Sequence, residues 1–223
     1  MRLTPEDHTQ VSAAVTAAET DTAGEIVTVV ARQSDKYNDV AAHAGVLAML
    51  LMLAILSVWP GIAGHIHALF HDPWGEAATP HMLFTIALVL ATVAFLAGRY
   101  ALAWMPLRIS LTPGATKSRR VRARALDLFR TSAEKRTVGQ TGVLIYLSLA
   151  EHRAELIADE AIHSKVAADV WGAAMTALVA AVKDGRPGDG MAEAVAQVGV
   201  VLAEHFPRAE DDVNELPDRL IEL

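Results

Sequence analysis

The chain has 223 residues, of which 52% are hydrophobic and none is cysteine. The lack of cysteine excludes disulfide bridges and thiolate metal sites. The formal net charge of −7 argues against nucleic acid as a general partner, because a surface that binds nucleic acid needs an excess of positive charge.

The N-terminal segment predicts a helix followed by a strand. Thr4 and Pro5 suit the cap and the first position of a helix. The stretch Glu25–Ala31 is β-branched and almost continuously apolar, as in a strand that is covered on both faces. The N-terminal residues lack the basic region followed by an apolar region that marks a secretory signal. We therefore expect the first hydrophobic segment to be an uncleaved anchor.

Residues 40–104 predict a transmembrane helical hairpin. Two apolar blocks, spanning about residues 44–63 and 82–103, are each long enough to cross a hydrocarbon core of about 30 Å. A buried helical pair in a soluble core is the alternative. It is disfavoured because the rest of a chain this small offers too little surface to cover both helices.

The distribution of basic residues predicts the orientation of this hairpin. Residues 64–81, the loop between the spans, contain no lysine or arginine. A dense group of basic residues follows the second span: Arg108, Lys117, Arg119, Arg120, Arg122, Arg124, Arg130, Lys135 and Arg136. We therefore expect a bacterial inner-membrane protein with an external loop and both termini in the cytoplasm.

The stretch Thr116–Arg136 predicts an arginine-rich helix with one apolar face. Its arginines could attract anionic lipid or bind a protein partner. The alternative is a solvated helix face that only marks the cytoplasmic side. The candidate lipid or partner surface consists of Arg119, Arg120, Arg122 and Arg124.

The second half of the chain predicts a β-hairpin, two helices and an acidic tail. Val143–Leu149 and Ala154–Ala158 read as its strands, and Ala167–Lys183 and Gly190–His205 as helices. We expect residues 207–223 to be a mobile acidic tail, with folding back onto the arginine-rich helix as an alternative.

Together these elements predict an α/β fold with a small mixed sheet of about three to four strands flanked by helices. If the first two strands are parallel neighbours, the chain between them is a crossover into which the hairpin is inserted. The cytoplasmic domain is then discontinuous, comprising residues 1–39 and 105–206.

Several segments carry a resemblance to a known family. They are the strand after Gly24, Ser34-Asp35, Gly142–Ser148, Arg153–Asp159 and a helix with Trp171. This order resembles the TPM domain family, and its bacterial membrane members in particular, over about residues 1–35 and 115–205. The resemblance implies an α/β sandwich. Plant members look like photosystem II repair factors with acid phosphatase activity, and an animal member is a receptor-associated membrane protein.

Four carboxylates are candidate ligands: Asp35, Glu155, Asp159 and Glu160. Asp35 follows the first strand and Asp159 follows the third, and ligands in open α/β sheets favour the carboxyl ends of strands. Such oxygen ligands would suit Ca²⁺ or Mg²⁺, or a phosphoryl site built around the metal. The third strand is expected to run antiparallel, so the four groups need not converge. Helix capping by Asp35 and Asp159 is the alternative.

The external loop holds a second candidate metal site. Imidazoles and carboxylates at this density can bind Zn²⁺, Cu²⁺ or Ni²⁺, or respond to external pH. The alternative is a loop that tolerates histidine because topology excludes lysine and arginine. The candidate ligands are His65, His67, His71 and Asp72, with Glu76 and His81 nearby.

The sequence shows no nucleophile–base motif, phosphate-cradling glycine loop or His-Glu-x-x-His pattern. The first hypothesis is therefore a non-catalytic membrane protein whose cytoplasmic domain binds a protein partner and assists assembly or turnover of a membrane complex. A metal-dependent phosphatase at the acidic strand ends is the second hypothesis. A metal or pH sensor acting through the external loop is the third.

Overall fold

The computed structural model describes residues 3–70, 78–132, 141–208 and 216–223. The chain forms two compact units. One contains Met1–Asp35 together with Gly114–Leu223, and the other is Lys36–Pro113. We call them the sheet unit and the helical unit.

The sheet unit contains a mixed sheet with the strand order β3-β2-β1-β4. Strand β1 is Glu25–Ala31, β2 is Gly142–Ser148, β3 is Arg153–Ala158 and β4 is Ile221–Glu222. Strands β1 and β2 are parallel, β2 and β3 are antiparallel, and β4 runs parallel to β1. The predicted α/β fold, with the two apolar helices between the first two strands, is confirmed.

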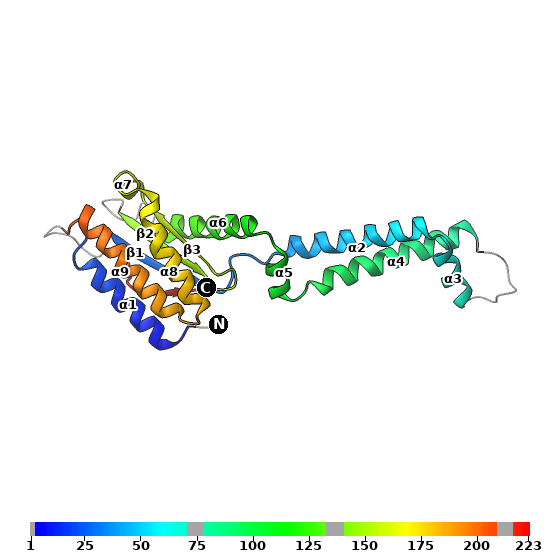
Figure 1. Cartoon of the computed structure of the whole chain (residues 1–223), viewed down its shortest axis with the longest axis horizontal. Coiled ribbons are helices and arrows are strands. Elements are labelled where there is room, and N and C mark those ends of the chain that lie inside the picture. Colours follow the sequence, from blue (N-terminus) through cyan, green and yellow to red (C-terminus); the bar gives the residue numbers. More distant parts are fainter. Residues whose placement is uncertain (1–2, 71–77, 133–140, 209–215) are drawn as a thin grey trace. The chain divides into compact units, whose positions relative to one another are not determined.

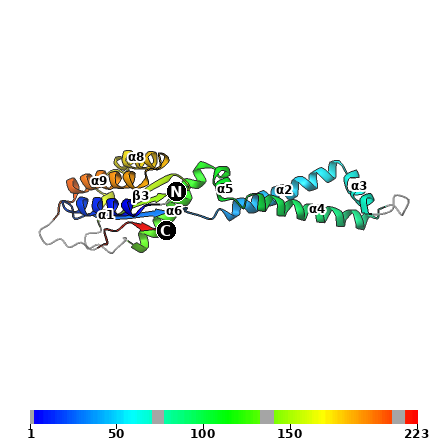
Figure 2. The ribbon, with the colours of Figure 1, turned by 90° about the horizontal axis from the view of Figure 1, so that it is seen from below.

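Helices cover both faces of this sheet, which explains why β1 and β2 are buried along their whole length. Ile26, Val30 and Ile145 face a core shared with α1 (Pro5–Glu19), α8 (Gly172–Lys183) and α9 (Pro187–His205). Val27, Val29, Leu144 and Tyr146 face the opposite core, together with α6 (Gly114–Ser132). Figure 1 shows α1, α8 and α9 gathered together, and Figure 2 shows this layer from another side.

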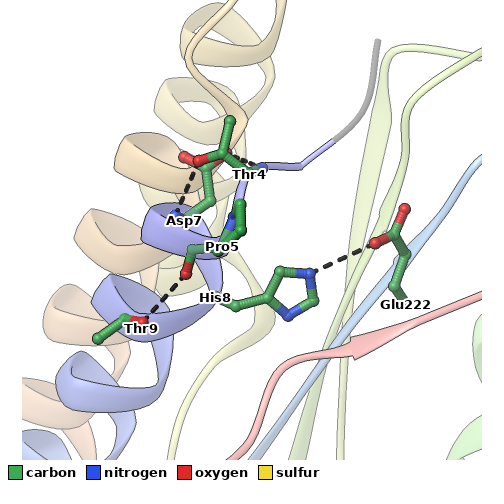
Figure 3. A network of polar contacts seen from close by, with 6 residues as sticks. All are labelled: Thr4, Pro5, Asp7, His8, Thr9 and Glu222. Carbon is green, nitrogen blue, oxygen red and sulfur yellow. Dashed lines mark hydrogen bonds and ion pairs between the residues drawn. The ribbon is translucent and has the colours of Figure 1, made fainter.

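The start of α1 is fixed by a reciprocal cap. The backbone N–H of Asp7 donates to the Thr4 hydroxyl at 3.2 Å, and the Thr4 N–H donates to the Asp7 carboxylate at 2.7 Å (Figure 3). With Pro5 in the first turn, these contacts satisfy backbone donors that lack partners within the helix. His8, at the end of the first turn of α1, lies 3.3 Å from Glu222 on β4 (Figure 3).

The C-terminal residues belong to the sheet unit. Leu220 is buried in the core beneath α1 and α9, and Leu216 is buried in the core beneath α6. The strand β4 adds two residues to the open side of β1. The prediction of a mobile tail is therefore wrong for residues 216–223, because their apolar side chains fill both cores between the acidic residues.

The helical unit consists of α2 (Asn38–Val58), α3 (Gly61–Phe70), α4 (Pro80–Ala101) and α5 (Met105–Leu111). Helices α2 and α4 pack along each other, and both are long and apolar enough to cross a membrane. Helix α2 ends before Pro60, earlier than the predicted residue 63, since proline lacks the backbone donor that a continuing helix needs. The short helix α3 then begins at Gly61, near the end of the predicted first span, and continues into the predicted loop.

The contact between α2 and α4 is built from small residues. A Cβ atom placed on Gly98 would lie 2.8 Å from the Ala48 Cβ and 2.9 Å from the Ala44 carbonyl oxygen. A Cβ atom on Gly45 would lie 2.9 Å from the Phe95 carbonyl oxygen. Such close approach of two backbones is typical of helices that associate in lipid, where packing replaces the hydrophobic effect as the driving force.

Candidate functional site

The four predicted acidic ligands lie at different places on the sheet. Asp35 follows β1, and Asp159 and Glu160 follow β3. Because β3 runs antiparallel to its neighbour, Asp159 and Glu160 lie at the opposite end of the sheet from Asp35. Glu155 lies within β3. The structure therefore places Glu155, Asp159 and Glu160 around one hollow beside β3 and leaves Asp35 apart from them.

Three of these carboxylates already contact groups of the sheet unit. Asp35 forms an ion pair with Arg120 at 2.5 Å, and Glu155 faces Arg122 at 3.5 Å. Asp159 accepts a hydrogen bond from the Gly142 backbone N–H at 3.1 Å. Among the described residues, no three histidine, aspartate or glutamate side chains are grouped so that they could hold a metal ion.

A buried polar cluster lies where β1 and β2 end. The Tyr146 hydroxyl lies 3.0 Å from the Ser34 hydroxyl, and the Glu151 carboxylate accepts from the Ser34 N–H at 2.9 Å. Glu151 also accepts a hydrogen bond from Ser148. Burial raises the pKa of the Tyr146 phenol, so it stays protonated. The cluster ties the chain after β1 to the β2–β3 turn.

One hollow in the described part of the sheet unit follows β3, the strand at one end of the sheet order. It has a volume of about 520 Å³. One wall is the inner face of α6, with Leu126 and Phe129, and the other contains Trp171 and Met175. A second hollow of about 370 Å³ shares Ala154, Glu155 and Met175 with the first and continues toward His152 along α8. We call these two hollows together the β3 groove.

Polar groups lie in the walls and at the rim of the β3 groove. Burial raises the pKa of the Glu155 carboxyl, although the positive charges of Arg122 and Arg153 oppose this shift. The Trp171 side chain is only 5% exposed, and its indole Nε1 has no hydrogen-bond partner among the described residues. Arg130 is exposed at the rim and forms no ion pair with a described residue.

The predicted basic surface of α6 is divided between internal and outward contacts. Arg120 turns toward Asp35, and Arg122 turns toward Glu155. Arg119 and Arg124 are exposed and make no ion pair within the described part of the chain. The outward charge of α6 is therefore carried by Arg119, Arg124 and Arg130, with Arg122 partly engaged.

The candidate ligands of the predicted external loop are only partly described. His65 and His67 lie on α3, and His65 Nδ1 is 2.6 Å from the Gly61 carbonyl oxygen of the same helix. His81 lies in the first turn of α4. The remaining candidates of this loop lie outside the described residues: His71, Asp72 and Glu76.

Sequence reasoning did not find the β3 groove. In the sequence, Trp171 marks only a helix, whereas in the structure Trp171 is buried and its ring also lines this hollow. The only signal in the sequence was the shorter and partly alternating third strand, a pattern that fits a strand with less cover than its neighbours. The open edge itself depends on the strand order, which no local pattern encodes.

Comparison with known proteins supports the fold. No family model matches the chain. No curated protein matches it either. Among solved structures, the NMR structure of BA42 protein from the psychrophilic bacterium Bizionia argentinensis matches with a TM-score of 0.57 and 19% sequence identity. The match covers 100% of this chain and 97% of that chain. At this identity the likeness shows the fold, which is TPM-like as the sequence resemblance implies.

Proposed function

We propose that the protein is a non-catalytic protein of the bacterial inner membrane whose sheet unit binds a protein partner in the cytoplasm, assisting assembly or turnover of a membrane complex. The observation that carries this proposal is the exposure of apolar side chains on α2 and α4. In the most apolar stretch of each helix, only 17% and 6% of the residues are buried. A helix that is apolar on all sides and uncovered requires an apolar surrounding, which a bilayer supplies.

The proposed orientation rests on charge. The chain that follows α4 is rich in arginine, and arginine-rich flanks remain on the cytoplasmic side. The aromatic residues Tyr100 and Trp104 are exposed near the end of α4, as expected for side chains at the level of the lipid headgroups. The sheet unit, which lies on both sides of the hairpin in sequence, is then cytoplasmic.

The proposed binding role rests on the β3 groove and the outward arginines of α6. Arginine, methionine and aromatic side chains, all present in these surfaces, are enriched at protein–protein interfaces. The TPM-like fold adds support, because the family that the sequence resembles includes photosystem II repair factors and a receptor-associated membrane protein.

Two measurements test this proposal. A C-terminal alkaline phosphatase fusion should be inactive and a C-terminal fluorescent protein fusion should be bright, and the reverse pattern would contradict the orientation. Photo-reactive residues introduced singly over the exposed surface of the sheet unit should crosslink to a discrete protein in native membranes. If no position crosslinks to any protein, the binding role is wrong.

A further inference from the structure

We infer that the open edge of β3 is a docking site for an extended peptide segment of the partner that carries acidic side chains and adds to the sheet as a further strand. This inference rests on the proposed function, namely that the sheet unit binds a protein. It goes further by naming the edge, the mode of binding and the chemistry of the bound segment.

The backbone of β3 supplies the first argument. The Asp159 N–H donates to the Gly142 carbonyl oxygen at 2.9 Å, and the register pairs Ala158 with Val143. In an antiparallel ladder, hydrogen-bonded and non-hydrogen-bonded pairs alternate. Ala154, Leu156 and Ala158 therefore direct their N–H and C=O groups away from β2. No described strand pairs with this edge, so these groups can accept an added strand.

The walls of the β3 groove supply the second argument. Side chains of an added strand alternate between the two faces of the sheet. On one face they would meet Leu126 and Phe129 of α6, and on the other Trp171 and Met175. The two hollows together border every residue of β3. A segment of about six residues, roughly 20 Å long when extended, would therefore pair with the whole strand.

The charge of the groove supplies the third argument and selects acidic side chains. Its lining holds four basic side chains and three carboxylates: Arg122, Arg130, Arg153 and Lys183 against Glu155, Asp159 and Glu160. Two of the carboxylates already have partners within the sheet unit, because Glu155 faces Arg122 and Asp159 accepts from the Gly142 N–H. Arg130 and the half-engaged Arg122 stand on the α6 wall, and arginine binds carboxylates with planar, paired hydrogen bonds. The buried Trp171 indole Nε1 lacks an acceptor among the described residues. A carbonyl or carboxylate oxygen of the bound segment would satisfy it, and such a buried donor is costly to leave without a partner.

The test uses the full-length protein in lipid nanodiscs and three synthetic peptides. The first alternates valine and glutamate, the second alternates valine and lysine, and the third repeats the first with N-methylated backbone nitrogens. Hydrogen exchange should show that the valine–glutamate peptide slows exchange at the amides of Ala154, Leu156 and Ala158. The lysine peptide should bind at least about tenfold more weakly, equivalent to about 1.4 kcal/mol. The N-methylated peptide should give no protection.

Matched variants separate the groove from general charge. Arg130→Glu should weaken binding of the valine–glutamate peptide about tenfold. Arg32→Glu makes the same charge change at an exposed position that does not line the groove and should leave binding almost unchanged. Leu156→Pro removes an outward N–H and should abolish protection, provided that its circular dichroism matches the parent protein. The hydrogen-exchange experiment uses the unmodified protein, so it tests the docking site at β3 even if Leu156→Pro does not fold.

The outcomes distinguish this inference from the proposed function. Equal binding of all three peptides, or protection confined to other elements, would overturn the docking site. In native membranes, a photo-reactive residue at Thr176 beside the groove should crosslink to the partner, whereas one at Val200 on α9 should not. Crosslinks at Val200 alone would overturn the docking site and leave partner binding intact. If neither these nor other surface positions crosslink, partner binding itself fails.

Discussion

The two units use similar apolar residues in opposite ways. In the sheet unit, Leu144, Ile145 and Leu147 are fully buried between two helical layers. In the helical unit, Leu47, Leu50 and Leu51 are each more than half exposed. The hydrophobic effect in water stabilises the first arrangement and opposes the second. If the protein is anchored in a membrane as proposed, one sequence encodes folding in two solvents.

The packing of the two units differs in the same sense. Large branched and aromatic side chains fill both cores of the sheet unit. The helical unit instead brings backbones together at Gly45 and Gly98. When the surroundings are as apolar as the side chains, only close packing distinguishes helix–helix contact from helix–lipid contact. Substitutions that act differently in the two units can therefore test this comparison.

The largest effect is expected for a charge placed on the uncovered face of α4. Leu88 is 68% exposed in the middle of this helix. If that face meets lipid, Leu88→Arg should cost about 3 kcal/mol of insertion free energy. We expect a smaller membrane-inserted fraction, measured by resistance to alkaline extraction.

The matched control for this change lies in the sheet unit. Val200 on α9 is 71% exposed, so its surroundings in the chain are as open as those of Leu88. In water, Val200→Arg should change stability by less than about 0.5 kcal/mol and leave insertion unaffected. Equal tolerance of both substitutions would contradict a lipid environment for α4.

The next largest effect is expected at the C-terminal end of the sheet unit. Leu220 is buried in the core beneath α1 and α9. Leu220→Ala should destabilise the sheet unit by about 2 kcal/mol through lost burial and the remaining cavity. Denaturant unfolding followed by circular dichroism measures this change. Leu223→Ala, at a half-exposed position, is the control, and equal stability of the two variants would mean that the tail is not part of the core.

A similar or slightly smaller effect is expected at the contact of the two apolar helices. A side chain at Gly98 would collide with Ala48 and with the Ala44 backbone, so Gly98→Val should cost about 1–2 kcal/mol by overpacking. Thermal unfolding in nanodiscs should show a lower midpoint. Gly64→Val on α3 is the control, because a Cβ there meets no described atom within 4 Å. An unchanged midpoint for Gly98→Val would show that α2 and α4 do not pack tightly.

Local sequence patterns were sufficient to predict the strands β1, β2 and β3 and the two apolar helices. Each of these elements carries a strong signal over six or more residues, such as the continuous β-branched run from Glu25 to Ala31. The short strand β4 escaped prediction because two residues, Ile221 and Glu222, carry no periodicity. Its place is set by tertiary contacts of Leu216 and Leu220, which lie among acidic residues.

The candidate site was less accessible to sequence reasoning for a related reason. The sequence pointed to carboxylates at strand ends, but strand direction separates Asp35 from Asp159. The β3 groove depends on residues from α6, β3 and α8, which are distant in sequence. Arg130 and Trp171 were visible as residue types, yet only the fold places both beside an open strand edge.

The last prediction concerns a buried carboxyl of the sheet unit. Glu19 is 8% exposed and accepts from the Ile26 N–H at 2.7 Å. Burial, with the nearby carboxylates of Glu25 and Asp218, raises the pKa of Glu19 from 4.5 to about 8. The folded protein therefore holds a proton on Glu19 between these values that the unfolded chain releases. The contribution of this group to stability is complete below about pH 4.5 and is lost as pH rises toward 8.

Glu19→Gln should remove this dependence, since a carboxamide can keep the acceptor for Ile26 and donate toward Asp218 without ionising. The free energy of unfolding of the variant should match that of the parent near pH 4 and exceed it by a margin that grows as pH rises from 4.5 toward 8. Denaturant unfolding across this pH range measures the difference, with Glu6→Gln at an exposed position as the control. A difference that is constant with pH would mean that Glu19 ionises normally. In that case water would reach the carboxylates of Glu19, Glu25 and Asp218, and only groups deeper in the sheet unit would be shielded from solvent.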